Sequence, residues 1–340
     1  MMEYEPLVYQ KNQIKILNQL LLPSITEYET YSDYIDILDA INAMKIRGTA
    51  LVGIAAGYGL LISLNNKTFA NKKQFKIYYE NIKKLFLKTR ESIRSLSYIF
   101  EVFDEVINSS EIPFDEVVKV LEKNAILFEK KEFSASDKIT ELAVNRVFNN
   151  KKSYKFLTLG NYGRLSTGGI GNTTGLFKKL LDAGVDIEVY IDETRPHFQG
   201  SRLTAWELKN NKIPYTIITA GEVAKLINDI GVDAVVIGAE QIASNGDVIS
   251  KIGSLSMALI ARYYQVPVFV LASTTTINPL LKTAEKFVTE SCKTDEILLI
   301  NGIRTAPVGS KILNYSFDMI PASLITAIIT EEGIITPINL

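Results

Sequence analysis

The sequence contains few of the residues that build metal and redox sites. Its 340 residues include one cysteine, Cys292, and one histidine, His197. A single cysteine excludes a disulfide framework and every metal site built from several cysteines. A single histidine argues against a histidine-rich metal site and against a Cys–His catalytic couple. We therefore expect a protein that depends little on cofactors.

An excess of charge of either sign is also missing. The chain has 37 lysines and arginines against 38 aspartates and glutamates, so its formal net charge is −1. This balance argues against a basic nucleic-acid binder and against a polybasic membrane surface. The first residues include Glu3 and Glu5 and lack the basic-then-apolar order of a signal peptide. We expect a cytoplasmic protein that binds neither nucleic acid nor membranes.

One long stretch, residues 48–66, lacks charge altogether. Its 19 residues are enough to cross a bilayer, and Gly53 and Gly57 have the spacing found in paired membrane helices. The stretch also holds four glycines and four polar residues, and Arg47 and Lys67 flank it on both sides. These features favour a helix buried in the core of a globular protein.

The length suggests two domains, and the first part of the chain is predicted to be mainly helical. Apolar residues recur there at helical spacing, at residues 34–44, 69–89 and 114–131. Ser32 is the expected cap of the first helix, and the lysines within 72–88 are expected to form a solvated face. The charged stretch 129–138 marks the predicted boundary between a domain of residues 1–133 and one of residues 134–340.

In the second part, short β-branched or aromatic runs alternate with helical stretches. The expected strands are residues 154–159, 187–191, 215–219, 234–237 and 266–271. The expected helices are residues 172–183, 201–210, 221–230 and 252–264. Such alternation is typical of an α/β domain in which helices cover both faces of a parallel sheet.

Polar residues gather in the loops that follow the predicted strands. These loops carry carboxylates, amides and hydroxyls, at residues 160–175, 192–202, 238–247 and 273–278, and Lys251 follows the third of them. Ligands of parallel α/β sheets bind at the carboxyl ends of the strands. The sequence therefore predicts a ligand site along this edge of the sheet.

The glycine-rich loop 160–175 leaves two interpretations open. Its glycines would let backbone N–H groups approach an anion at a helix N-terminus, or they would only form a tight turn. The spacing Gly169, Gly171, Gly175 is one residue longer than the dinucleotide fingerprint. This difference disfavours a nicotinamide-dependent oxidoreductase.

Two other motifs have both a functional and a structural explanation. Arg47-Gly48-Thr49, ahead of the uncharged stretch, would clamp an anion or only begin a helix. Glu240, at the end of a predicted buried strand, would be a general acid or base, or an ordinary loop carboxylate. Two further residues are better explained as structural or incidental: His197 and Cys292.

Taken together, the loops resemble those of the methylthioribose-1-phosphate isomerase family. The resemblance is carried by GNYGRLSTGGIGNTTG, DETRPHFQGSRLTAWEL and GAEQIASNGDVISK. The family is related to the ribose-1,5-bisphosphate isomerases and to the alpha, beta and delta subunits of initiation factor 2B. The resemblance implies a small, mainly helical N-terminal domain and a Rossmann-like C-terminal domain, assembled as a homodimer. It also implies conversion of a furanose 1-phosphate to a ketose 1-phosphate, as in methionine salvage, without metal or other cofactor.

The resemblance also implies which residues bind the sugar phosphate. Arg47, Gly48 and Thr49 match the family's phosphate-binding RGA segment, with threonine in place of alanine. Three further residues match substrate-binding positions: Arg90, Gln199 and Lys251. Ser250 stands where the family has an asparagine.

Both catalytic positions of the family differ in this chain. Gly160 stands where the family's HCNAG-like stretch has its cysteine, and Glu240 replaces the aspartate of GADRI. Two hypotheses follow. In the first, the chain is an isomerase of methylthioribose 1-phosphate or a related pentose 1-phosphate, with Glu240 as general acid/base. In the second, it is a catalytically silent paralogue that binds a sugar phosphate or nucleotide and regulates a partner.

Overall fold

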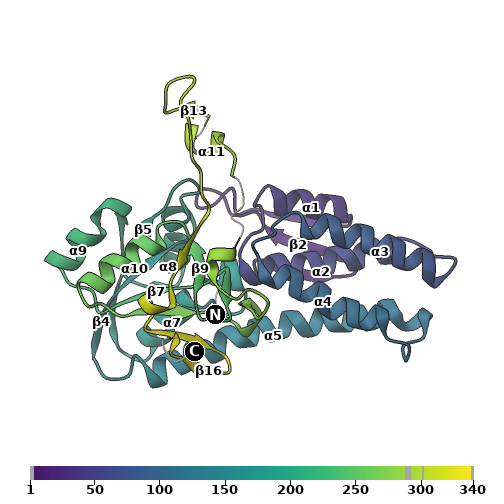
Figure 1. Cartoon of the computed structure of the whole chain (residues 1–340), viewed down its shortest axis with the longest axis horizontal. Coiled ribbons are helices and arrows are strands. Elements are labelled where there is room, and N and C mark those ends of the chain that lie inside the picture. The colour runs from purple at the N-terminus through teal and green to yellow at the C-terminus, as the bar shows by residue number, and fades with distance from the viewer. Residues whose placement is uncertain (1–3, 288–291, 301, 338–340) are drawn as a thin grey trace.

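The computed structural model describes residues 4–287, 292–300 and 302–337. The N-terminal part combines a small antiparallel sheet with a group of helices (Figure 1). Its strands are β1 (Leu7–Gln10), β2 (Gln13–Leu17) and β3 (Tyr28–Tyr31). Its helices are α1 (Tyr34–Asn42), α2 (Thr49–Asn65), α3 (Lys72–Leu87), α4 (Arg94–Asn108) and α5 (Val117–Arg146). The predicted helices are confirmed, whereas the small sheet was not predicted.

Helix α2 accounts for the uncharged stretch. All its residues from Thr49 to Leu64 are buried, and the neighbouring helices α1, α3, α4 and α5 pack around it. The expectation of a core helix is confirmed. Within the described parts of the chain, no helix has both the length and the apolar character needed to cross a membrane. The cap of α1 is Asp33, whose side chain accepts a hydrogen bond from the Ile35 N–H, so the expectation of Ser32 was wrong.

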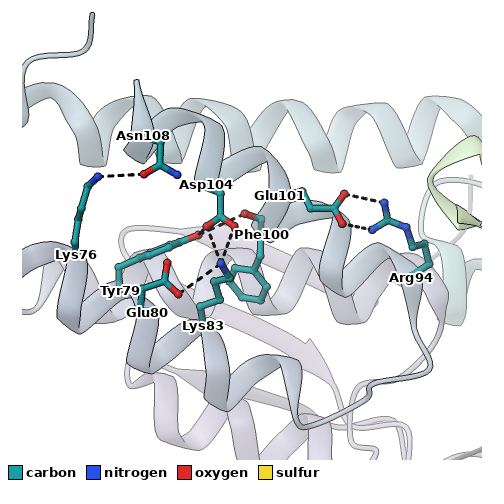
Figure 2. Close-up of polar contacts among 9 residues, drawn as sticks. All are labelled: Lys76, Tyr79, Glu80, Lys83, Arg94, Phe100, Glu101, Asp104 and Asn108. Atoms are coloured by element: carbon teal, nitrogen blue, oxygen red, sulfur yellow. Dashed lines mark hydrogen bonds and ion pairs between the residues drawn. The ribbon is translucent and has the colours of Figure 1, made fainter. Parts of the chain in front are cut away.

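One acidic residue of α4, Asp104, pairs with a lysine of α3 (Figure 2). Lys83 Nζ lies 2.6 Å from Asp104 Oδ2, and the Tyr79 hydroxyl donates to the other oxygen of the same carboxylate. At the start of α4, Arg94 binds both carboxylate oxygens of Glu101, at 2.9 and 2.7 Å. The contacts of Asp104 join α3 to α4, whereas the Arg94–Glu101 pair lies within α4.

The C-terminal part is built on a seven-stranded sheet in the order β16-β15-β10-β7-β4-β5-β6. The strands are β4 (Ser153–Leu159), β5 (Asp186–Glu193), β6 (Tyr215–Thr219), β7 (Ala234–Ile237), β10 (Val268–Leu271), β15 (Ala327–Thr330) and β16 (Gly333–Ile335). Only β16 runs antiparallel to its neighbour. All five predicted strands are confirmed, and β15 and β16 extend the sheet beyond them.

Helices cover both faces of this sheet, as predicted. They are α7 (Thr173–Asp182), α8 (Ala205–Asn210), α9 (Val223–Asp229) and α10 (Ser254–Tyr263), whereas α6 (Arg164–Thr167) packs against α2 and α5. Apolar residues of α5, α7 and α8 pack in one hydrophobic cluster with the sheet, and those of α9 and α10 pack in another. A π-helical turn, Gly200–Thr204, precedes α8.

A second sheet lies beside the carboxyl ends of the central strands. Its order is β11-β8-β9-β14. The strands are β8 (Gln241–Ala243), β9 (Val248–Lys251), β11 (Ile277–Asn278) and β14 (Phe317–Ile320). An arm with α11 (Asp295–Leu298), β12 (Leu299–Ile300) and β13 (Ile303–Arg304) projects from the body (Figure 1). The second sheet positions Lys251, which ends β9.

Helix α5 connects the two parts without a break and runs through the predicted boundary at residue 133. Its first half packs against α2 and α4, and its second half packs against α7. Phe128 belongs to the core of the N-terminal part, whereas Ala135 belongs to that of the sheet. We propose that the division between the domains falls within this helix, between those two residues.

Candidate active site

Residues from both parts of the chain meet in one pocket. Six of the residues expected from the sequence to form the site line it: Arg47, Gly48, Arg90, Gln199, Glu240 and Lys251. They come from the turns before α2 and α4, the segment after β5, the end of β7 and the end of β9. His197, for which the sequence favours a structural role, lines the same pocket. The charged lining consists of three cations and one carboxylate, so the pocket favours an anionic ligand.

A buried network orients the guanidinium of Arg47. Arg47 donates to the Asn161 side-chain oxygen at 2.7 Å and to its backbone oxygen at 3.0 Å. Asn161 in turn donates to Glu207 Oε2 at 2.6 Å and to the Thr204 hydroxyl at 3.2 Å. Burial lowers the pKa of Arg47, and the nearby carboxylate of Glu240 opposes that shift. The arginine is therefore held as a rigid, desolvated cation.

The supporting residues of this network were not identified from the sequence. Glu207 is fully buried, and its Oε1 accepts hydrogen bonds from the Tyr4 hydroxyl at 2.7 Å and the Leu165 N–H at 2.9 Å. Burial raises the pKa of Glu207, and these donors and Arg47 oppose the shift. The only feature of the sequence that could have indicated a role for Glu207 is its place in the motif RLTAWEL.

Gly48 occupies a position that no larger residue fits. Its φ angle is +101°, which L side chains rarely adopt, and a Cβ atom would overlap the backbone of Ser166. We expect Gly48→Ala to lower the free energy of unfolding by about 2–4 kcal/mol, from backbone strain and overpacking. Urea denaturation measures this loss.

Gly221→Ala is the matched control for that substitution. A Cβ atom on Gly221 would have no neighbour within 4 Å, and the residue has no positive φ. Its substitution is therefore expected to change stability by less than about 0.5 kcal/mol. Equal losses for the two variants would contradict the steric explanation.

Thr49 and Ser250 do not line the pocket with the other predicted residues. The Thr49 N–H donates to Ser166 Oγ at 3.3 Å, and its side chain faces a separate small cavity that Glu132 also lines. The Ser250 hydroxyl is fully buried, donates to the Gly238 carbonyl at 2.9 Å and contacts the Tyr162 hydroxyl at 2.9 Å. In this structure both side chains support the walls of the site.

Position 160 is enclosed by two neighbouring side chains. A Cβ atom on Gly160 would lie 3.3 Å from Lys251 Cβ and 3.4 Å from Tyr162 Cε2. The Tyr162 hydroxyl accepts a hydrogen bond from the Lys251 N–H at 3.2 Å. The lysine stem and the tyrosine ring therefore border the place where a longer side chain at residue 160 would begin.

Charges within the pocket shift the protonation of its members. Burial lowers the pKa of Lys251 to about 8, with Glu240 opposing the shift and Arg47 adding to it. Burial, together with Lys251, Arg90 and other nearby cations, lowers the pKa of His197 to about 3. At neutral pH the imidazole is uncharged, while Lys251 is close to releasing its proton.

The residue after Glu240 ties the start of β8 to the turn that carries Arg90. Gln241, next to Glu240, donates to the Ser92 carbonyl at 2.6 Å and accepts from Asn278 at 3.0 Å. The Arg94–Glu101 pair lies within α4, which begins directly after this turn. The sequence did not indicate this bridging role of Gln241.

Cys292 lies nearer the pocket than its position in the sequence indicated. Its sulfur contacts the hydroxyl of Ser316, a residue that lines the pocket. Nowhere in residues 4–287, 292–300 or 302–337 do three or more histidine, cysteine, aspartate or glutamate side chains form a group suited to a metal ion.

Comparisons with known proteins agree with the motifs. The model of the initiation factor 2 subunit family matches residues 45–337. A methylthioribose-1-phosphate isomerase of Acetivibrio thermocellus is 34% identical over 334 residues, covering 98% of this chain and 97% of that protein. Its counterpart from Caldicellulosiruptor saccharolyticus is 35% identical over 333 residues, covering 97% and 95%.

Solved structures with the same fold include both enzymes and initiation factors. The 5-methylthioribose 1-phosphate isomerase of Pyrococcus horikoshii superposes with a TM-score of 0.83 at 26% identity, covering 98% of this chain and 96% of that one. Subunit delta of the translation initiation factor eIF-2B from A. fulgidus gives 0.81 at 27% identity, with the same coverage. The overall fold therefore does not distinguish the isomerases from the initiation factor subunits.

Proposed function

The chain belongs to the initiation factor 2 subunit family, and we propose that within it the chain is an aldose–ketose isomerase of the methylthioribose-1-phosphate type. Relatives 34% and 35% identical over nearly the whole chain carry the name methylthioribose-1-phosphate isomerase. The observation that carries the proposal is the convergence of Arg47, Arg90, Gln199, Glu240 and Lys251 on one pocket. The reaction would be the sugar-phosphate isomerisation of methionine salvage.

The cationic side of the pocket would bind the phosphate. Arg47 keeps its plane fixed through Asn161, so its remaining N–H groups are oriented before the ligand arrives. Pre-oriented, desolvated donors bind anions more strongly than exposed ones. Arg90 and Lys251 add positive charge, and Gln199 offers an amide that suits a sugar hydroxyl. Gly48 lets the turn that carries Arg47 pack closely against Ser166.

Glu240 would supply general acid/base catalysis. The residue is 7% exposed, lies between β7 and β8 and lines the same pocket as Arg47 and Gln199. Because the phosphate stays on C1, the furanose ring must open with a proton given to the ring oxygen, and hydrogen must then move from C2 to C1. A buried carboxyl in this position is suited to one of these proton transfers.

One observation favours the alternative, a regulatory protein that binds a sugar phosphate or nucleotide without turning it over. Position 160 has no side chain, and Tyr162 and Lys251 border the space beside it. The fold also matches an initiation factor subunit nearly as well as an isomerase.

Phosphorus NMR of the purified protein with methylthioribose 1-phosphate and a panel of pentose 1-phosphates tests the two functions. An isomerase produces a new ketose 1-phosphate resonance. Broadening of the substrate resonance without a new product would support the regulatory alternative and contradict the enzyme.

The chain would work as a cytoplasmic homodimer. On the exposed side of α10, Leu259 and Tyr263 are 52% and 81% exposed and lie one helical turn apart, which suits contact with a second copy. Light scattering during size-exclusion chromatography would then give twice the chain mass of 37.9 kDa, whereas a single-chain mass would contradict the dimer.

A further inference from the structure

The proposed reaction needs two groups that exchange protons at different oxygens. One group must give a proton to the ring oxygen while the bond between C1 and that oxygen breaks. The other must accept the proton of the C2 hydroxyl as that carbon becomes a ketone. Glu240 can perform only one of these tasks at a time.

Few described side chains of the pocket can exchange a proton near neutral pH. Arg47 and Arg90 keep their charge because a guanidinium does not deprotonate in proteins. His197 is already neutral, with its pKa lowered to about 3 by burial and by the surrounding cations. Among the described lining residues, Lys251 and Glu240 are the remaining side chains whose functional groups can give or take a proton.

Lys251 is held firmly beside the glycine at position 160. Its backbone pairs with Phe317 of β14, and its N–H donates to the Tyr162 hydroxyl at 3.2 Å. The residue is 4% exposed, and its Cβ and Cγ lie 3.3 and 3.6 Å from the place of a Cβ on Gly160. The lysine stem thus crosses the wall of the pocket at the position where this chain has no side chain of its own.

We propose that Lys251 is the general acid that protonates the ring oxygen and that Glu240 is its partner base. This inference rests on the proposed function, and it assigns Lys251 a proton-transfer role beyond holding the phosphate. A carboxylate and an ammonium group on two buried residues of one pocket form an acid/base pair that can be restored by proton transfer between them.

The proposed step balances within the substrate and this pair. Lys251 gives a proton to the ring oxygen, which keeps the electron pair of its bond to C1 and becomes the C4 hydroxyl. The hydrogen on C2 moves with its electron pair to C1, so C1 is reduced and C2 is oxidised. The C2 hydroxyl proton passes to Glu240 as the ketone forms. Transfer of that proton from Glu240 to the neutral lysine restores both residues.

The surroundings of Lys251 predict how the rate depends on pH. The charged or titratable groups around it are Glu240, Arg47, Arg90, His197, Tyr162, Cys292 and Glu296. Burial is the main cause that lowers its pKa to about 8. The acid form is present below this pKa, so kcat/KM should fall as the pH rises through about 8.

Lys251→Arg tests the acid role because arginine keeps the positive charge but does not give up its proton. We expect kcat to fall by about 10²-fold or more. Affinity for inorganic phosphate, measured by calorimetry, should stay within about threefold, and the decline above pH 8 should disappear from the residual activity. Lys73→Arg, at an exposed residue of α3, is the matched control and should leave all three quantities unchanged.

Lys251→Ala gives a second test that does not depend on how an arginine fits. Added methylamine or ethylamine should restore part of its turnover, as expected when a small amine replaces a missing acid. Turnover of Lys251→Arg within threefold of the unmodified protein would overturn the acid role. So would a loss of phosphate affinity equal to the loss of turnover. An unmodified protein without turnover would instead refute the proposed function, so the two failures are distinguishable.

Discussion

Replacing Glu240 with glutamine is expected to lower kcat by about 10²- to 10⁴-fold, the usual contribution of a positioned acid or base. Glutamine has nearly the same shape, and the Glu240 N–H already bonds to the Ile249 carbonyl at 2.8 Å. The backbone and the pocket should therefore stay in place while the proton transfer is lost. Steady-state kinetics with methylthioribose 1-phosphate measures the effect.

Binding should respond differently from turnover in the same variant. Removing a negative charge from a pocket that holds Arg47, Arg90 and Lys251 should keep or increase the affinity for inorganic phosphate. Since Glu240 raises the pKa of Lys251, any residual activity should begin to decline at a lower pH. Glu285→Gln, at an exposed residue, is the control. Unchanged turnover of Glu240→Gln would remove this carboxyl from the mechanism.

Replacing Arg47 with lysine should weaken phosphate binding by about 10- to 100-fold. The substitution keeps the charge but loses the planar fork that binds both oxygens of Asn161. Loss of charge-assisted hydrogen bonds costs about 1.5–3 kcal/mol, and each 1.4 kcal/mol is about tenfold in affinity. Calorimetric titration with inorganic phosphate measures the change on either hypothesis about turnover.

The expected loss of phosphate affinity is specific to Arg47 and should not follow from replacing an arginine elsewhere. Arg262→Lys, at an exposed residue on the far end of α10, should leave the phosphate affinity unchanged. Thermal unfolding of both variants checks that the folded state persists, because Asn161 loses hydrogen bonds from the guanidinium in Arg47→Lys. An unaltered dissociation constant for Arg47→Lys would contradict its assignment as the phosphate clamp.

The parallel sheet and the core helix could be predicted because each residue pattern favoured one explanation over the others. Five short apolar runs separated by helical stretches permit little besides a parallel sheet, and 16 of the 17 residues of α2 are buried. The second sheet was not predictable in this way. Its strands β8 and β11 have three and two residues, so their pairing depends on tertiary contacts and leaves no period in the sequence.

The lining of the site was predictable from motifs, whereas its support was not. Strand-end loops converge for topological reasons, and six of the expected residues do line one pocket. The position of His197 depends on the fold of the segment after β5, and the position of Cys292 depends on the arm. Neither segment has a repeating pattern of apolar residues from which its structure could be predicted. Glu207 has no signal of its own in the sequence, because its hydrogen-bond partners include Tyr4, more than 200 residues away.

The roles proposed for Glu240 and Lys251 require catalysis without a thiol, and Cys292→Ser probes this requirement because it removes the chain's only sulfhydryl group. The measurement is phosphorus NMR of this variant and of the unmodified protein with methylthioribose 1-phosphate. We expect a ketose 1-phosphate resonance that grows at the same rate in both samples. If only the unmodified protein forms product, the thiol of Cys292, near Ser316, takes part in the reaction. That result would contradict the roles of Glu240 and Lys251. No product from either would contradict the isomerase itself.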